Sequence, residues 1–83
     1  MKLLVIEDEH RIAQAIRRGL MQEGYAVDVA FNGEEGYRTA VADEYDVIVM
    51  DIMMPGMSGI DITKKLRAEN NHTPILLLTA KGL

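Results

Sequence analysis

Short runs of apolar residues alternate along the chain with segments in which apolar residues recur at helical spacing. Continuous apolar runs occupy residues 3–6, 47–50 and 75–78, and residues 26–30 alternate around Asp28. Continuous runs are typical of strands buried on both faces, as in a parallel sheet covered by helices, whereas the alternating run indicates an edge strand. The order of strands and helices predicts an α/β fold in which βα units feed a parallel sheet.

Three helices are expected, over residues 10–23, 34–43 and 59–67. Gly24 suits a left-handed stop after the first helix, and Ser58 suits the N-cap of the third. Two glutamates in the first turn of the second helix are favoured by the helix dipole. The helical spacing places one set of side chains toward the sheet. These are Ile12, Ala13, Ile16, Leu20, Tyr37, Ala40, Val41, Ile60, Ile62, Thr63 and Leu66.

Composition narrows the class of protein. A single domain is expected from 83 residues, and folding a chain of this size buries only roughly 60 to 65% of the surface that the unfolded chain exposes. The chain has no cysteine, which excludes disulfide and thiolate chemistry and fits a cytoplasmic location. The apolar runs are too short to span a bilayer, and the N-terminal run is too short for a signal peptide.

The net charge argues against nucleic-acid binding by this segment. The formal net charge is −4, so this segment lacks the basic surface of a nucleic-acid-binding protein. The small basic clusters, Arg17 with Arg18 and Lys64 with Lys65 and Arg67, are interpreted as solvated helix faces.

Acidic residues follow two of the apolar runs. Glu7 and Asp8 come directly after residues 3–6, and Asp51 comes directly after residues 47–50. Ligand sites in open parallel sheets form at the carboxyl ends of strands, so these side chains are expected at one edge. If the two strands are neighbours, about 4.8 Å apart, the carboxylates repel one another, and either a pKa rises or a cation binds. A small set of oxygen ligands suits Mg²⁺.

Asp51 also stands where phosphoryl transfer needs a nucleophile. Aspartate can form a covalent aspartyl phosphate, and a neighbouring Mg²⁺ would polarise the incoming phosphoryl group. Pro55, Gly56 and Gly59 permit a sharp turn whose main-chain N–H groups can point at phosphate oxygens. Thr79, at the end of the fourth run, can supply a hydroxyl on the opposite side. The pattern predicts a pocket for magnesium and a phosphoryl group.

At these residues the chain resembles the receiver domain of bacterial two-component response regulators. The matching elements occur in order along all 83 positions. One apolar strand ends in Glu7-Asp8, another ends in Asp51 followed by Met53-Met54-Pro55 and Gly59, and a third ends in Thr79-Ala80. The opening residues 1–9 look most like members that carry a C-terminal winged-helix DNA-binding domain.

The resemblance implies a phosphoacceptor rather than an enzyme, with at most self-catalysed phosphotransfer and autodephosphorylation. It implies that Asp51 accepts the phosphoryl group from a sensor histidine kinase. It also implies that Asp8, Asp51 and the backbone carbonyl of Met53 hold Mg²⁺ directly, and that Glu7 acts through water. Thr79 would be the switch hydroxyl, and the parent protein would regulate transcription.

The chain departs from this family at its C-terminal end. By the resemblance, residues 1–83 are a partial receiver domain that lacks the fourth helix, the fifth strand and the fifth helix, together with the lysine of that strand; Lys81 is not its counterpart. Phosphorylation and output are therefore expected to be impaired. The fold implied is a truncated three-layer flavodoxin-like sheet with strand order 2-1-3-4. Residues 75–78 would form an exposed apolar edge, which predicts self-association into a dimer or larger assembly.

Two other functions use similar features. A haloacid-dehalogenase-like aspartyl-phosphate phosphatase would want a second aspartate two residues after Asp51, where this chain has Met53. A flavodoxin-like nucleotide or flavin binder would need a phosphate loop after the first strand, where Glu7, Asp8 and Glu9 would repel phosphate unless a metal were present.

Each of these candidate residues also has a purely structural interpretation. The acidic residues after the first run could simply lead into a helix, and Asp51 could be a turn residue at a strand end. Thr79 could be an ordinary strand threonine. Met50, Met53, Met54 and Met57 are interpreted as loop packing rather than a soft-metal site. His10 and His72 are interpreted as surface or helix-end residues.

Overall fold

The computed structural model describes residues 1–79 as four strands that alternate with three helices. The elements are β1 (Lys2–Ile6), α1 (His10–Gln22), β2 (Ala26–Ala30), α2 (Gly33–Ala42), β3 (Val47–Asp51), α3 (Gly59–Ala68) and β4 (Ile75–Leu78). Every predicted element is present, and its bounds lie within one residue of the prediction. Periodicity alone therefore located the elements in this chain.

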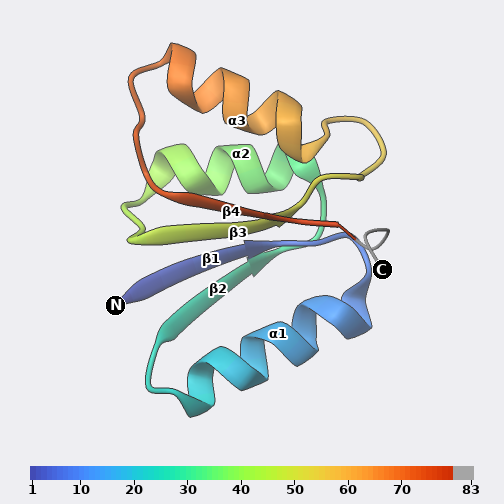
Figure 1. Ribbon diagram of the computed structural model, residues 1–83, viewed down its shortest axis with the longest axis vertical. Helices are drawn as coiled ribbons and strands as arrows, with labels where there is room; N and C mark the ends of the chain where they lie inside the picture. The colour runs from blue at the N-terminus through green and yellow to red at the C-terminus, as the bar shows by residue number, and fades with distance from the viewer. Residues whose placement is uncertain (80–83) are drawn as a thin grey trace.

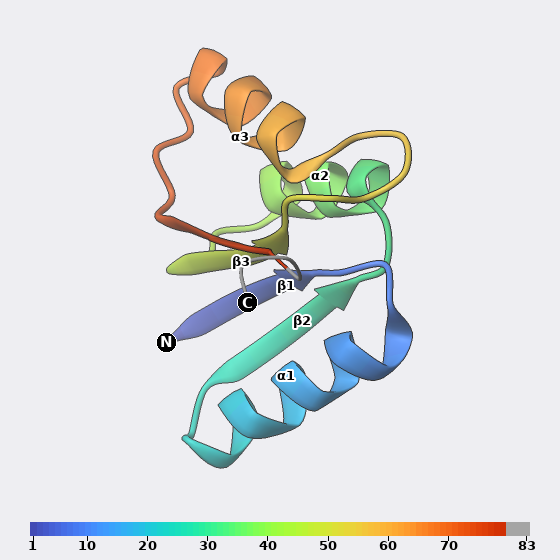
Figure 2. The ribbon, with the colours of Figure 1, turned by 45° about the vertical axis from the view of Figure 1, so that its right-hand side comes forward.

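The four strands form one parallel sheet in the order β2-β1-β3-β4. Figure 1 shows three layers, with α1 on one face of the sheet and α2 and α3 on the other. The view in Figure 2 confirms that α1 lies alone on its side, where it packs against β1 and β2. The predicted fold class and strand order are confirmed.

The main core lies between the sheet and the pair α2 and α3. Leu4 and Ile6 of β1 and Ile48 of β3 are fully buried there, against Ile62 and Leu66 of α3. Alternate strand residues point to opposite faces, so Leu3 and Val5 instead meet the α1 side, where Ala13 is the buried helix residue. Both faces of β1 are therefore apolar, as its continuous run predicts.

Three side chains that were expected to face the sheet are exposed. Ile12 is 46% exposed, Val41 50% and Ile60 40%, so these predictions were wrong. Successive helix residues diverge by about 100°. When Ala13, Ala40 and Ile62 are buried, Ile12 and Val41 lie one residue away and Ile60 lies two residues away, so all three side chains turn from the buried face.

The helix ends follow the chemistry of capping. Gly24 has φ of +92° after α1, as predicted. Ser58 caps α3, and Asp61 completes a capping box by accepting the Ser58 backbone N–H. Asn32 caps α2 because its side-chain oxygen accepts the Glu35 N–H at 2.8 Å.

Arg67 was interpreted as a charge on a solvated helix face, but its side chain forms hydrogen bonds to the backbone. Its Nη1 donates to the carbonyl oxygens of Asn71 at 3.0 Å and Thr73 at 2.9 Å. The guanidinium therefore fixes the connection between α3 and β4. A guanidinium can serve two acceptors in this way because it presents several donors in a rigid plane.

β4 lies at one edge of the sheet. Within residues 1–79 it pairs with β3 alone, and Leu76 is 55% exposed. Ile75 and Leu77 pack on the main core, so Leu76 and Leu78 face the α1 side. The expected apolar edge is present in this part of the chain. None of the helices described in residues 1–79 is long and apolar enough to cross a membrane.

Candidate metal centre

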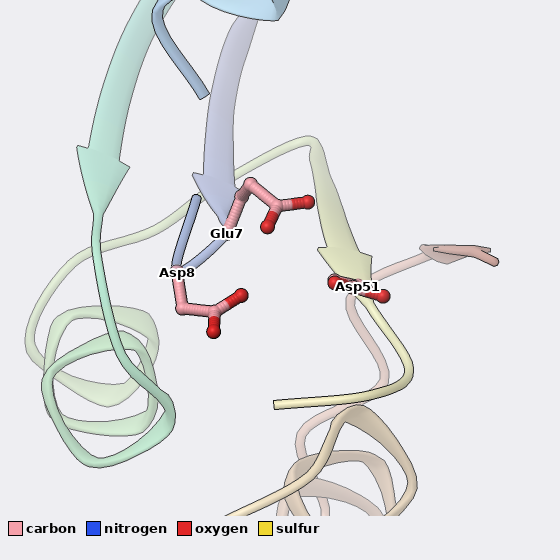
Figure 3. Close-up of side chains that lie close together, drawn as sticks. All are labelled: Glu7, Asp8 and Asp51. Carbon is pink, nitrogen blue, oxygen red and sulfur yellow. The ribbon is translucent and has the colours of Figure 1, made fainter. Parts of the chain in front are cut away.

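Three carboxylates meet at the carboxyl edge of the sheet. Glu7 and Asp8 follow β1 directly, and Asp51 is the last residue of β3. The two strands are neighbours, with Ile6 opposite Met50, so their ends come side by side. Carboxylate oxygens of Glu7, Asp8 and Asp51 all lie within 4.8 Å of one another. Figure 3 shows Glu7 and Asp8 extending from the end of β1 toward Asp51.

Glu7 is the most buried of the three. It is 5% exposed, and its Oε2 accepts the backbone N–H of Glu9 at 2.9 Å. Burial raises the pKa of Glu7 above its usual value, and the neighbouring Asp8 and Asp51 carboxylates raise it further, against the opposing effect of the Glu9 N–H. The cluster is therefore electrostatically unfavourable by itself, and a bound cation would relieve the repulsion.

Asp51 is half-buried at the start of a tight loop. Its Oδ1 accepts the backbone N–H of Met53 at 3.1 Å, which brings the Met53 backbone to the site while the Met53 side chain is 61% exposed. Gly59 closes the loop because its N–H donates to the Ile52 carbonyl at 3.0 Å. A Cβ at Gly59 would lie 2.5 Å from the Asp51 carbonyl oxygen, so only glycine permits this approach.

Thr79 borders the same region. A hollow of roughly 280 Å³ is lined by Glu7, Ile12, Asp51, Leu78 and Thr79. Leu78 is opposite Asp51 in the sheet, so Thr79, the next residue, lies at the same edge of the sheet as Asp51. Ile12 was not predicted to line the site, because its spacing in α1 indicated a buried residue. The only signal in the sequence was its closeness to the acidic loop.

The donor set fits a hard divalent cation. All three grouped side chains offer carboxylate oxygens. Mg²⁺ prefers oxygen ligands, whereas softer metals prefer thiolate or imidazole ligands. Met50 and Met54 are buried and Met57 packs against the core, as expected for packing residues, whereas the same prediction was wrong for the exposed Met53. The His10 ring stacks on Phe31 with centroids 4.0 Å apart, and His72 is exposed. Both histidines agree with their interpretation as surface or helix-end residues.

The fold belongs to the class of open parallel α/β sheets, in which ligands bind outside the carboxyl ends of the strands, and the three carboxylates of this chain lie at that position. Residues 3–83 match the response regulator receiver domain family. The chain belongs to that family, and the family assignment favours neither the phosphatase nor the flavin-binder alternative.

Individual relatives agree with this assignment. The chain is 48% identical to the transcriptional regulatory protein CusR of Escherichia coli K12 over 82 residues, which are 99% of this chain and 36% of that protein. It therefore spans about a third of the length of this curated relative.

Solved structures share the fold closely. A Francisella receiver domain has a TM-score of 0.93 and 40% identity, over 99% of this chain and 68% of that one. The response regulator TrrA of Thermotoga maritima, solved in complex with Mg²⁺ and BeF, has a TM-score of 0.92 and 37% identity, over 98% of this chain and 70% of that one.

Proposed function

We propose that this chain is a phosphoacceptor module in which Asp51 accepts a phosphoryl group beside a bound Mg²⁺. The observation that carries the proposal is the convergence of Glu7, Asp8 and Asp51 within 4.8 Å at the ends of two adjacent strands. A carboxylate in such a cluster can act as a nucleophile when a cation offsets the neighbouring charge.

The residues take distinct roles in this proposal. Asp8, Asp51 and the Met53 backbone carbonyl hold Mg²⁺ directly, and Glu7 acts through water. When bound, Mg²⁺ supplies charge neutralisation and polarisation of the phosphoryl oxygens. An Asp51 carboxylate oxygen forms the new bond to phosphorus, while the bond from phosphorus to the donor breaks and the donor leaves with its electron pair. The Thr79 hydroxyl then responds as the switch.

The wider context is part of the same proposal. The donor is a sensor histidine kinase in the cytoplasm. The parent protein is a transcriptional regulator, as the name of the relative CusR suggests, and the resemblance of residues 1–9 implies that it carries a winged-helix DNA-binding domain. The TrrA complex supports the Mg²⁺ assignment by analogy. The chain's catalytic activity would be at most self-catalysed phosphotransfer and autodephosphorylation. That residues 1–83 form a partial receiver domain, without the fourth helix, the fifth strand and the fifth helix, stays a prediction.

The direct test is labelling with acetyl phosphate in the presence and absence of Mg²⁺. Intact-protein mass spectrometry should show one added phosphoryl group in the wild type with Mg²⁺ and none in Asp51→Asn, because the amide is not a nucleophile. Asp46→Asn is the matched control, since Asp46 is an exposed aspartate beside the opposite end of the same strand. Labelling that persists in Asp51→Asn would reject Asp51 as the acceptor.

A further inference from the structure

We propose that Gly33, the first residue of α2, is a positioning residue for the loop that carries Asp51. Gly33 lies outside the carboxylate cluster and is buried. Its effect would pass through the backbone of the loop between β3 and α3. This inference rests on the function proposed above, because it concerns the same metal site.

The contact that carries the proposal is between two backbones far apart in sequence. A Cβ at Gly33 would lie 2.1 Å from the carbonyl oxygen of Met57 and 2.9 Å from its Cβ. The obstacle is a main-chain atom, so no change of side-chain rotamer can make room. Any residue other than glycine at position 33 must move either α2 or the loop.

On the α2 side of this contact, hydrogen bonds hold the backbone in place. Asn32 Oδ1 accepts the Glu35 N–H at 2.8 Å, and Glu35 Oε1 accepts the Phe31 N–H at 2.8 Å. The Gly36 N–H also donates to the Asn32 carbonyl at 2.9 Å. These reciprocal bonds fix the first turn of α2. We therefore expect the loop to move when a side chain is added at Gly33.

A displacement at Met57 would reach the metal site because the loop is short and closed. The Gly59 N–H ties back to the Ile52 carbonyl at 3.0 Å, and Gly59 packs directly against the Asp51 carbonyl. Within the same loop, the Met53 N–H holds Asp51 Oδ1 at 3.1 Å. A shift of the loop backbone would therefore disturb both the Asp51 carboxylate and the Met53 backbone, which are two of the proposed ligands.

The experiment compares Mg²⁺ binding by calorimetry in the wild type, Gly33→Ala and Gly36→Ala. Gly36 is the matched control because it is buried one turn further along α2, and its Cβ would meet the Ile6 side chain at 2.6 Å rather than the loop. We expect Gly33→Ala to bind Mg²⁺ about tenfold more weakly, the scale seen when groups that orient metal ligands are lost. Gly36→Ala should lose stability while its folded fraction keeps the wild-type affinity.

The backbone amide of Met53 gives a second readout, because its NMR shift should move in metal-free Gly33→Ala and not in Gly36→Ala. If Gly33→Ala does not fold, Asn32→Ala is the substitute. It removes the cap that holds the first turn of α2, and it should also weaken Mg²⁺ binding. Wild-type affinity in the folded Gly33→Ala or Asn32→Ala protein would overturn the inference, as would equal weakening in Gly36→Ala. Failure of the wild type itself to bind Mg²⁺ would instead count against the proposed metal site.

Discussion

Glu7 combines near-complete burial with two neighbouring carboxylates, and this combination makes its ionisation in the folded protein unfavourable. Its pKa is raised by burial and by the charges of Asp51 and Asp8. As pH rises past the usual glutamate value, the unfolded chain loses its proton before the folded protein does. The unfolded state then binds fewer protons, so the free energy of unfolding falls as pH rises toward the raised pKa of Glu7.

We therefore expect Glu7→Gln to be more stable than the wild type at neutral pH without metal. The two proteins should converge below the usual glutamate pKa, where Glu7 is protonated in both states. Saturating Mg²⁺ should stabilise the wild type more than the variant, because the cation offsets the charge of the cluster. Urea unfolding across pH, with and without Mg²⁺, measures both effects.

Glu9→Gln is the control for this comparison, since Glu9 is adjacent and exposed and its substitution should leave the pH dependence unchanged. The amide of glutamine keeps an acceptor for the Glu9 N–H, so the comparison isolates the charge of Glu7. A wild type that gains stability between the usual glutamate pKa and neutral pH, relative to Glu7→Gln, would contradict the role given to this burial.

At the scale of the elements, the start of α3 depends on a capping box. Ser58 Oγ accepts the Asp61 N–H, and Asp61 accepts the Ser58 N–H, both at 3.1 Å. Ser58→Ala removes one acceptor, and the loss of an N-cap typically costs about 1 kcal/mol. In a domain of this size that loss should lower Tm by roughly 4–8 °C, which calorimetry can measure. Ser58→Asn retains a capping acceptor and should keep most of the stability.

Asp61 of the same capping box affects the pH dependence of the free energy of unfolding with a sign opposite to that of Glu7. The Ser58 backbone N–H and hydroxyl lower the pKa of Asp61, with a smaller contribution from Lys64. The stability that this carboxylate contributes is present above the usual aspartate pKa and is lost as pH falls through the lowered value. The difference between the wild type and Asp61→Asn should thus disappear in acid. If the stability difference between the wild type and Asp61→Asn persisted unchanged at acidic pH, the charge of Asp61 would not contribute to the capping box.

Considering the molecule as a whole, residues 1–79 present the strand β4 at one edge of the sheet. Its residues, Ile75–Leu78, are all apolar, and Leu76 is 55% exposed. An uncharged apolar edge is free to pair with another strand. We propose that this edge mediates self-association of the 83-residue chain. Sedimentation velocity across a range of concentrations should then show a dimer or larger species.

Leu76→Lys should shift that equilibrium toward the monomer, because a lysine on an edge strand opposes pairing with a second copy. Val41→Lys is the matched control, since Val41 is 50% exposed and lies on α2, which packs mainly against α3, β1 and β2. A wild type that sediments as a monomer at high concentration would remove the basis of this proposal. Equal dissociation by both variants would show that the contact lies elsewhere or is not specific.

The residue pattern was enough to predict the elements, their order along the chain and the edge of the sheet at which Asp8 and Asp51 meet. These features follow from short-range physics. Apolar periodicity distinguishes strands from helices, and parallel strands joined by helices bring their carboxyl ends to one side of the sheet. The predicted bounds were confirmed for this reason. The strand order, which the family resemblance implied, was also confirmed.

Several burials and contacts between distant backbones could not be predicted from the residue pattern, because they depend on how the elements pack. Glu7 is buried while Ile12 is exposed, although sequence patterns suggest the reverse. Arg67 bonds to the loop before β4, and Gly33 lies against Met57. These contacts depend on the angles and distances at which whole helices and loops pack together. A local pattern fixes the direction of a side chain on its own element, but not the neighbour that it meets.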